Sequence, residues 1–411
     1  MNITGIVVEY NPFHKGHLYH LQKTKELTKC DAIIAVMSGN FAQRGTPAVV
    51  DKWNRTKMAL TNGVDLVLEL PLIYSMSSAE FFSYGAVSLL NGLGVVNNIC
   101  FGSEYGNVDI LNYIAKILTE EPYEFKELLK NKLNIGLSYP DARAQSLQEF
   151  ILNYNSHNIF NLNLEEILYS SNNILGIEYC KSLLRLQSKI IPFSVKRKGA
   201  SFSSVSLDHE FSSATSIREH IKLNNDLNGL KNYLPENVYS LLISLKDRGY
   251  TFTFENSMLP YIKYKYTMYK DMIKNLPDVS EGIENRIYKF LYETEDLNSL
   301  ISLIKTKRYT YTRINRILCQ FFIGFENFNT YELRKNPCPY ARVLGFNNKG
   351  IEILKLIKHN SSIPVYSKLP KDQNAILSLD ILGTKVYSLL NRSVHPNSDY
   401  LISPIRIKES L

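Results

Sequence analysis

Short apolar runs alternate with amphipathic stretches over the first hundred residues of the chain. The apolar runs cover residues 3–10, 32–38, 64–71 and 96–104, and the amphipathic stretches cover 17–27, 50–63 and 78–94. Strands and helices in this order predict a parallel sheet with helical crossovers. Because the runs are apolar throughout, we expect helices on both faces of the sheet.

The loops that follow the predicted strands all lie at one edge of this sheet. They read NPFHKG, GNFAQRG, LPLIYS and GSEYG. Ligands of open parallel sheets bind beyond the carboxyl ends of the strands. These four loops are therefore the first place to look for functional residues.

The pattern changes further along the chain. Residues 106–170 and 170–186 read as helices, 190–197 as a strand, and a Ser-rich loop then leads to a helix start near Ser213. From about residue 225 the periodicity is mainly helical. We predict an α/β sheet domain over residues 1–225 and a mainly helical domain over residues 226–411.

Composition narrows the classes of protein. The net charge of +8 and the 27 tyrosines fit a polyanionic partner, although a mildly basic chain need not have one. Five scattered cysteines without a C-x-x-C pair argue against a disulfide framework and a zinc site. No apolar run approaches the roughly 20 residues of a membrane span, and the N-terminus lacks the features of a secretory signal. We expect a cytoplasmic protein without a membrane partner.

Two histidines, His14 and His17, stand where the first strand gives way to the first helix. Pro12 favours extended backbone before the helix, and Gly16 permits close backbone approach. A helix N-terminus offers unpaired N–H groups and a partial positive charge, which favour phosphate. The pair predicts an anion site, the alternative being histidines that serve only packing or the surface.

The segment NPFHKGH resembles the His-x-Gly-His signature of the nucleotidylyltransferase superfamily, whose histidines contact ATP phosphates as pyrophosphate leaves. This chemistry needs positioning and charge stabilisation rather than a covalent nucleophile. The second signature, a Ser/Thr-rich turn ending in Thr-x-Ile-Arg, is matched at 212–218. The resemblance implies that Ser213 and Thr215 hold terminal phosphates and that Arg218 adds charge. Ala214 replaces a hydroxyl of many members, and alone the segment fits an ordinary helix cap equally well.

Longer segments resemble the bacterial tRNA(Met) cytidine acetate ligase family over nearly the whole chain. The matching segments are VVEYNPFHKGHLYHL, VMSGNFAQRGTPAVVDKWNRTKMAL, GVDLVLELP, FGSE, SSNNILGIEY, SATSIR, LIKTKRYTYTR and VLGFNNKG. The resemblance implies a Rossmann-like nucleotidylyltransferase domain followed by a helical tRNA-binding domain. It also implies an enzyme that activates acetate with ATP as acetyl-adenylate and acetylates the wobble cytidine of elongator tRNA(Met) to N4-acetylcytidine.

The family's ATP site carries over to this sequence by position. It comprises the catalytic candidates His14 and His17 within the run Val7, Val8, Glu9, Tyr10, Asn11, Pro12, Phe13, His14, Lys15, Gly16, His17, Leu18, Tyr19 and His20. It also includes Gly102, Asn172 and Arg197. Without the resemblance, these three would equally fit a turn glycine, a helix cap and a solvated loop residue.

For acetate, the loop GNFAQRG supplies Asn40, Gln43 and Arg44, because a small carboxylate needs a cluster of donors near the α-phosphate. No cluster of acidic residues has the spacing of metal ligands. We therefore expect no metal site in the protein and Mg²⁺ carried mainly by the ATP phosphates.

The segment at 305–316 interleaves basic and aromatic side chains without an acidic residue. The RNA-binding candidates are Lys305, Lys307, Arg308, Tyr309, Tyr311, Arg313 and Arg316. Basic groups neutralise phosphates, and tyrosines stack on unpaired bases. The alternative is one solvated face of an amphipathic helix.

Two other functions remain open at this point. The superfamily signatures alone also fit a small-molecule adenylyltransferase, against which the long basic C-terminal half argues. A non-catalytic ATP-dependent RNA-binding protein would use the same histidines without turnover. The sequence leaves the oligomeric state open.

Overall fold

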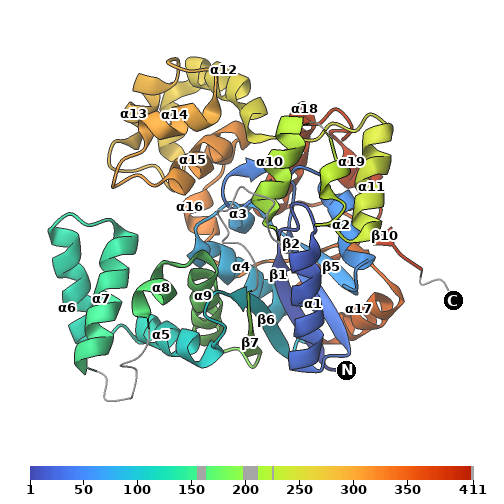
Figure 1. Cartoon of the computed structure of the whole chain (residues 1–411), viewed down its shortest axis with the longest axis horizontal. Coiled ribbons are helices and arrows are strands. Elements are labelled where there is room, and N and C mark those ends of the chain that lie inside the picture. The colour runs from blue at the N-terminus through green and yellow to red at the C-terminus, as the bar shows by residue number, and fades with distance from the viewer. Residues whose placement is uncertain (155–162, 198–211, 225, 409–411) are drawn as a thin grey trace.

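The computed structural model describes residues 1–154, 163–197, 212–224 and 226–408. Its core is an eight-stranded sheet in the order β10-β8-β5-β2-β1-β6-β7, with β9 beside β8 (Figure 1). The strands are β1 (Ile3–Val8), β2 (Ala32–Ser38), β5 (Leu66–Leu70), β6 (Asn98–Ser103), β7 (Ile191–Lys196), β8 (Ala341–Phe346), β9 (Val365–Tyr366) and β10 (Ile405–Arg406). All described neighbours in this sheet pair in parallel except β5 and β8. The predicted α/β class with a parallel sheet is confirmed.

Both faces of the sheet are buried, as the continuous apolar runs predict. Every residue of β2 is buried. Ile34 and Val36 point into one hydrophobic cluster, whereas Ile33, Ala35 and Met37 point into the other. This alternation is the period of a strand between two layers of helices.

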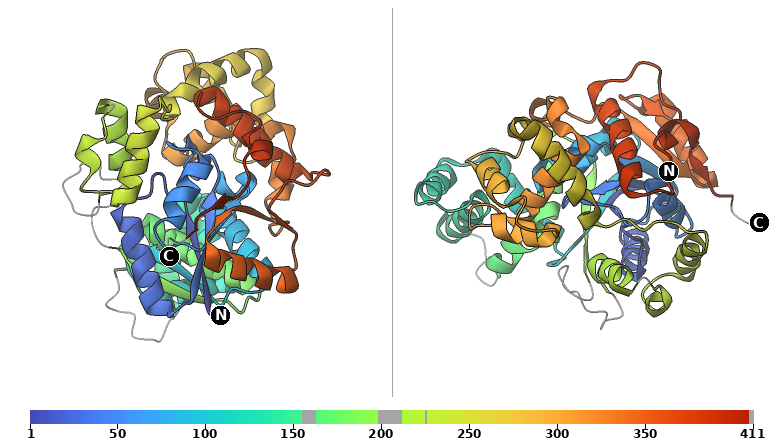
Figure 2. Two further views of the ribbon diagram at one scale, coloured as in Figure 1. Left: turned by 90° about the vertical axis from the view of Figure 1, so that its right-hand side faces the viewer. Right: turned by 90° about the horizontal axis from the view of Figure 1, so that it is seen from above.

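The helices of the sheet region lie close to the predicted helical segments, except that the short helix Leu72–Ser75 occupies the predicted loop LPLIYS. They are α1 (Lys15–Thr28), α2 (Lys52–Leu60), α3 (Leu72–Ser75), α4 (Ala79–Gly92), α5 (Val108–Glu120), α6 (Tyr123–Asn134), α7 (Tyr139–Tyr154), α8 (Leu164–Tyr169), α9 (Ser171–Arg185) and α10 (Ala214–Asn224). The hairpin of α6 and α7 projects from the side of the molecule opposite α1 (Figures 1 and 2). Most of the predicted Ser-rich loop lies outside the described residues.

A group of helices lies above the carboxyl edge of the sheet (Figure 1). The helices beyond residue 225 are α11 (Glu236–Asp247), α12 (Leu259–Tyr269), α13 (Ile283–Phe290), α14 (Leu297–Ile304), α15 (Tyr311–Ile323), α16 (Thr330–Leu333), α17 (Asn348–Asn360), α18 (Ala375–Leu390) and α19 (Ser398–Leu401). Four short 3-10 helices join them: η1 (Asn228–Leu230), η2 (Glu255–Met258), η3 (Lys270–Asn275) and η4 (Phe325–Asn327). The mainly helical character of this part agrees with the sequence pattern.

The sheet also receives strands from beyond residue 225, which the sequence pattern did not indicate. β8, β9 and β10 return from the helical part and extend the edge next to β5. A buried ion-pair network holds this return: Lys52 Nζ lies 2.7 Å from Glu69 Oε1 and 2.8 Å from Asp399 Oδ1, and Arg342 Nη2 lies 2.9 Å from the same Asp399 oxygen. The part of the chain after residue 225 is therefore not purely helical. The domain boundary between residues 225 and 226 stays a prediction.

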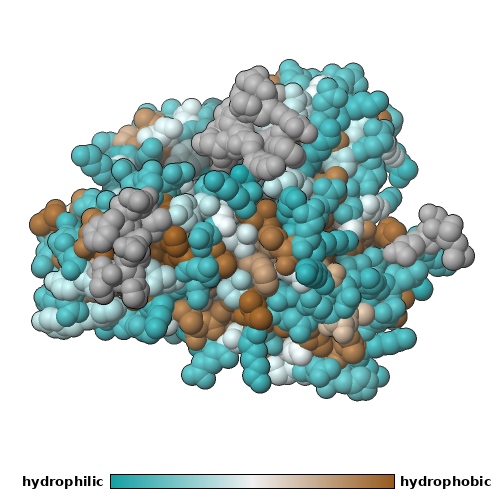
Figure 3. Space-filling model, turned by 60° about the horizontal axis from the view of Figure 1, so that its bottom comes forward, coloured by the Kyte–Doolittle hydropathy of each residue, from teal (hydrophilic) through white to brown (hydrophobic). Residues whose placement is uncertain are grey.

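The described helices lack the combination of length and apolar character that a membrane span requires. Figure 3 shows one face of the molecule, on which polar side chains surround smaller apolar areas. Scattered apolar surface of this kind is normal in globular proteins.

Candidate active site

A cavity of about 760 Å³ opens at the carboxyl edge of the sheet. Its lining includes the ends of β1, β6 and β7, the first turns of α1, α9 and α10, and three residues at the start of α15. Loops at this edge were predicted to form the site. Segments far apart in the sequence therefore meet around one cavity.

The start of α1 presents two histidines that its own backbone holds in place. His14 is the N-cap, and its Nδ1 accepts a hydrogen bond from the Gly16 N–H at 3.1 Å. His17 Nδ1 accepts from the His14 N–H at 3.3 Å, and the two rings stack with centroids 3.7 Å apart. Because each Nδ1 is an acceptor, the proton of each neutral ring is assigned to Nε2. Both rings line the cavity as neutral hydrogen-bond donors.

Burial keeps these histidines uncharged. Burial, then Arg197 and Arg218, lowers the pKa of His14 to about 3. Burial and His14 hold the pKa of His17 well below its ordinary value. Burial and Arg197 lower the pKa of His20 to about 4. The positive charge at this end of the cavity therefore comes from the two arginines, not from imidazolium.

Gly16 makes the position of the His14 ring possible. A Cβ at residue 16 would lie 2.9 Å from His14 Cε1 and 3.0 Å from Nδ1. A side chain there would push the ring away from the backbone N–H that it caps. The glycine of the His-x-Gly-His motif thus serves the first histidine.

The start of α10 lies across the cavity from α1 and is tied to it by Arg218. Arg218 Nη1 donates to the Asn11 carbonyl at 2.8 Å, and Nη2 donates to Thr215 Oγ1 at 3.1 Å. Ser213 Oγ accepts from the Ser216 N–H at 3.0 Å and so caps the helix. Two helix N-termini and one arginine therefore surround the same space, an arrangement that favours a polyphosphate.

The start of α9 is fixed to the end of β6 by Glu104, which directly follows the strand. Glu104 accepts hydrogen bonds from Asn172 Nδ2 at 2.6 Å and from the Asn173 N–H at 2.9 Å. Arg197 crosses close to the strand end, where a Cβ at Gly102 would be in ordinary contact with its Cγ at 3.4 Å. Gly102, Asn172 and Arg197 all line the cavity.

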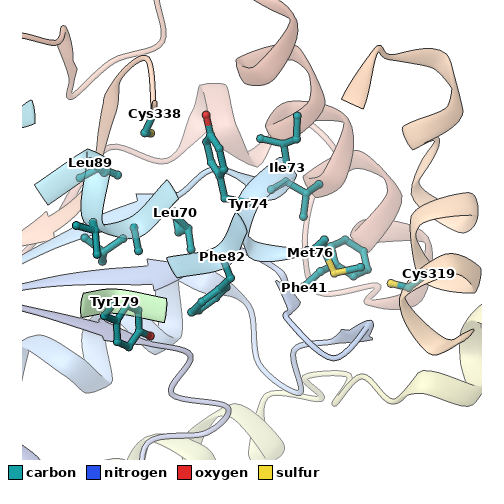
Figure 4. Close-up of a cluster of buried hydrophobic side chains, with 14 of the residues drawn as sticks. Phe41, Leu70, Ile73, Tyr74, Met76, Phe82, Leu89, Tyr179, Cys319 and Cys338 are labelled. Carbon is teal, nitrogen blue, oxygen red and sulfur yellow. The ribbon is translucent and has the colours of Figure 1, made fainter. Parts of the chain in front are cut away.

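A short antiparallel hairpin, β3 (Phe41–Ala42) and β4 (Thr46–Pro47), joins the sheet region to the helices above it. Arg44 Nη2 donates to Ser171 Oγ at 3.3 Å, and Asn315 Nδ2 donates to the Arg44 carbonyl at 2.8 Å. Phe41 lies beside Cys319 of α15 (Figure 4). A Cβ at Gly45 would lie 2.6 Å from the Arg316 nitrogen, which shows how closely the hairpin approaches α15.

The described residues contain no group of three or more His, Cys, Asp or Glu side chains placed to hold a metal ion. The Nδ1 atoms of His14 and His17 both accept backbone N–H groups. The motif histidines are thus arranged for an anion.

Known proteins match this chain along almost its full length. The model of the family described as HIGH Nucleotidyl Transferase matches residues 1–400. A tRNA(Met) cytidine acetate ligase from Clostridium kluyveri is 59% identical over 407 residues, which cover 99% of each chain. One from Clostridium novyi is 56% identical over 410 residues, 99% of this chain and 100% of that protein. The chain belongs to the tRNA(Met) cytidine acetate ligase family.

A solved structure agrees with this membership. The crystal structure of Thermotoga maritima TmcAL bound with alpha-thio ATP superposes with a TM-score of 0.89 at 34% identity, covering 99% of this chain and 100% of that chain. The suspected membership of the tRNA(Met) cytidine acetate ligase family and the nucleotidyltransferase fold are confirmed.

The structure brings most of the predicted ATP residues to the cavity of this family member. From the first motif, those at the cavity are Val7, Val8, Glu9, Tyr10, Asn11, His14, Gly16, His17, Tyr19 and His20. Pro12, Phe13, Lys15 and Leu18 do not line it. Ser213 and Arg218 line the cavity, whereas Thr215 supports Arg218 from behind. Their roles toward ATP stay predictions.

Only two of the three acetate candidates lie at the cavity. Gln43 and Arg44 line the cavity, and the Gln43 N–H donates to Glu9 Oε1 at 2.8 Å. Asn40 is buried away from the lining, where its Oδ1 accepts from the Lys52 N–H at 2.9 Å and its Nδ2 donates to Thr384 Oγ1 at 3.3 Å. Both ends of the Asn40 amide therefore hold the scaffold, and the roles of the three residues toward acetate stay predictions.

The basic run at 305–316 also separates into two kinds of residue. Lys305, Lys307, Arg308 and Tyr311 are exposed. Tyr309 is buried and its hydroxyl donates to the Glu281 carbonyl, so its ring is not exposed for stacking on a base.

Two arginines of the same run are engaged by the fold. Arg313 Nε donates to the Asp278 carbonyl at 3.1 Å, and Arg316 Nε lies 3.5 Å from Asp278 Oδ2. Arg316 nevertheless lines the cavity mouth together with Thr310 and Thr312. The C-terminal part of the run therefore lines the cavity, whereas the exposed basic residues lie in the N-terminal half of the run.

Sequence reasoning missed Glu104, which positions Asn172 by accepting from its side chain and backbone. It also missed Arg143 and Glu178, which line the cavity as an ion pair with 2.6 Å between Nη1 and Oε1. Glu104 stands in the quoted segment FGSE, directly after a strand, and its position was the available signal. Glu178 stands in the quoted segment SSNNILGIEY, but inside a helix rather than at its end, and Arg143 stands in ordinary helical sequence without such a signal.

Proposed function

We propose that the protein is an ATP-dependent acetate ligase that forms acetyl-adenylate and acetylates the wobble cytidine of elongator tRNA(Met) to N4-acetylcytidine. The observation that carries the proposal is the pair of neutral, backbone-held histidines at the start of α1, linked by Arg218 to the start of α10. Family membership supports the same reaction, since the Clostridium relatives are named for it.

In the first step, an acetate oxygen attacks the α-phosphorus of ATP and the bond to the bridging oxygen breaks, releasing pyrophosphate. Negative charge builds up on the departing oxygens. The Nε2–H groups of His14 and His17 and the partial positive charge at the two helix starts would stabilise this charge. Arg197 and Arg218 supply the permanent positive charge. Fixed donors gain most in such a site because they need no reorganisation during the reaction.

Acetate itself would lie near the β3–β4 hairpin. Gln43 and Arg44 line the cavity there and present donors to a small carboxylate. The lining contains the carboxylates of Glu9, Glu80 and Glu178. They do not form a metal cluster, so Mg²⁺ would enter bound mainly to the ATP phosphates and would add charge stabilisation there.

In the second step, the N4 lone pair of the cytidine attacks the acetyl carbon and the bond to AMP breaks. The tRNA would approach across α15, whose N-terminal residues Thr310, Thr312 and Arg316 line the cavity mouth. The exposed Lys305, Lys307 and Arg308 lie just before this helix and would meet phosphates of the tRNA.

The test is a complete reaction with purified protein, ATP, Mg²⁺, labelled acetate and elongator tRNA(Met), followed by nucleoside analysis. Labelled N4-acetylcytidine is expected, together with AMP and pyrophosphate. Omission of ATP, acetate or tRNA is expected to abolish it. A complete reaction without acetylcytidine would refute the proposed activity.

A further inference from the structure

Part of the cavity is lined by residues that belong to neither phosphate motif. We call this part the α7 wall and define it by Glu80 and Phe82 of α4, Arg143 and Leu147 of α7, and Glu178 and Tyr179 of α9. Helix α7 lies on the side of the molecule opposite α1 in two views (Figures 1 and 2). The α7 wall therefore borders a region of the cavity that the turns of the two phosphate motifs do not line.

The charges of the α7 wall are paired. Arg143 Nη1 lies 2.6 Å from Glu178 Oε1, and Lys181 Nζ lies 3.5 Å from Glu178 Oε2 and 3.2 Å from Glu80 Oε1. Two cations and two carboxylates leave no net charge. The opposite end of the cavity, with Arg197 and Arg218 beside neutral histidines, is positively charged. A triphosphate fits that end, and the α7 wall suits a neutral polar group.

The wall combines apolar surfaces with one donor group beside one acceptor group. Phe82 and Tyr179, drawn in Figure 4, and Leu147 belong to the main hydrophobic cluster. Glu178 has only 2% of its side chain exposed but still lines the cavity. Removing an ion pair from water costs free energy, so such a pair facing a cavity calls for a ligand that uses it. A flat heterocycle with a polar edge has the matching shape and chemistry.

Cytosine matches this pair better than the other pyrimidine of RNA. Its Watson–Crick edge presents the N4 amino group as a donor beside the acceptors N3 and O2. A carboxylate accepts from N4, and a guanidinium donates to N3 or O2. Uracil presents the O4 acceptor where cytosine has its amino group, which places oxygen against the Glu178 carboxylate.

We propose that the α7 wall is the pocket for the target cytosine, with Glu178 accepting from N4 and Arg143 donating to N3 or O2. This inference rests on the proposed function and names the site where its second substrate binds. Thr310, Thr312 and Arg316 of α15 line the same cavity, so a base that enters beside α15 would reach the wall. The base would leave the anticodon loop and enter between α15 and the wall.

The pocket would orient N4 for the transfer. With one N4–H directed at Glu178, the N4 lone pair forms the bond to the acetyl carbon. The carbon–oxygen bond to AMP breaks, and its electrons pass to the AMP phosphate. The second N4 proton leaves with that phosphate, so that the product keeps one N–H.

The test compares binding of two transcripts, elongator tRNA(Met) with its wobble cytidine and the same tRNA with uridine at that position. Wild-type protein is expected to bind the cytidine form at least tenfold more tightly. Glu178→Gln is expected to reduce this preference to less than threefold, because an amide can also donate to O4 of uracil. Arg143→Lys keeps the charge but loses the planar fork, and we expect it to lower kcat/KM for tRNA at least tenfold.

The control is Glu149→Gln, which changes a carboxylate of α7 that pairs with Lys132 at 3.1 Å and does not line the cavity. It is expected to keep the wild-type preference. Acetate-dependent pyrophosphate exchange without tRNA distinguishes the possible failures. A Glu178→Gln protein that loses this exchange would assign the wall to ATP and overturn the inference. Equal binding of both tRNAs by wild-type protein would also overturn it, whereas absence of exchange in wild-type protein would refute the proposed function itself.

Discussion

The turn that begins α1 and the basic run at 305–316, which leads into α15, both contain candidate residues, but the fold holds their side chains in different ways. His14 and His17 are held by hydrogen bonds within their own motif. The side chains of the run are held by distant residues: Tyr309 by the Glu281 carbonyl and Arg313 by Asp278. A motif that fixes its own side chains keeps its meaning in the folded protein. A run that is recognised only by its composition can have some of its side chains used for tertiary packing instead of binding.

The largest effect is expected at the self-contained motif. His14→Ala and His17→Ala each remove one Nε2–H donor, and removal of one such donor costs about 100-fold or more in rate. We expect acetylcytidine formation to fall by at least that factor, measured with saturating tRNA. His359→Ala, at the exposed end of α17, is the matched control. Activity within threefold of wild type in either motif variant would contradict the functional role that the comparison gives to the α1 turn.

The next effect concerns the packing that engages the arginines of the run. Burial opposes the charge of Asp278, but Arg316 and Arg334 hold its pKa below the ordinary value. Asp278→Ala would leave these buried arginines without their carboxylate and is expected to destabilise the fold by about 3 kcal/mol. Urea denaturation measures this loss.

The matched control is Asp271→Ala, which removes an exposed partner of Lys274 and is expected to leave the free energy of unfolding almost unchanged. If both substitutions had equal effects, Asp278 would not bind the run to the fold. The run would then be a surface feature, as its composition alone indicates.

The buried histidines also predict a pH dependence of stability. The pKa of His14 is about 3 in the folded protein and about 6.5 when unfolded. Between these pH values the unfolded chain binds a proton at His14 and the folded chain does not. This contribution is fully present above pH 6.5 and is lost as the pH falls toward 3. Between pH 7 and pH 5, His14 alone is expected to lower the free energy of unfolding by about 2 kcal/mol. Urea unfolding of wild type and His14→Gln at both pH values should differ by this amount, and equal pH dependence would contradict it.

The smallest effect is expected at the exposed half of the run. Lys307→Gln with Arg308→Gln removes two charges, so the slope of log affinity for tRNA against log salt should decrease by about 1 to 2. Binding at several salt concentrations measures the slope, with Lys358→Gln on exposed α17 as control. An unchanged slope would identify these side chains as an ordinary solvated surface.

The same contrast explains what the sequence could predict. Most strands and helices through residue 224 follow from continuous apolar runs and helical periodicity, and both phosphate motifs stand at strand or helix ends that local sequence defines. The short elements β3 and α3 lie in segments that were predicted to be loops. The strands β9 and β10 have only two residues each, too short for a period to appear. The scaffold contacts of Asn40 could not be predicted, because its partner Thr384 lies 344 residues away. Pairings of this kind exist only in the folded chain.

Acetate-dependent exchange of labelled pyrophosphate into ATP, measured without tRNA, tests the central claim most directly. Wild-type protein and the Lys307→Gln, Arg308→Gln variant are expected to exchange at similar rates, because the first step does not use the exposed basic residues before α15. His14→Ala and His17→Ala are expected to show almost none. Exchange that persists in both histidine variants, or that requires tRNA in wild-type protein, would contradict the account.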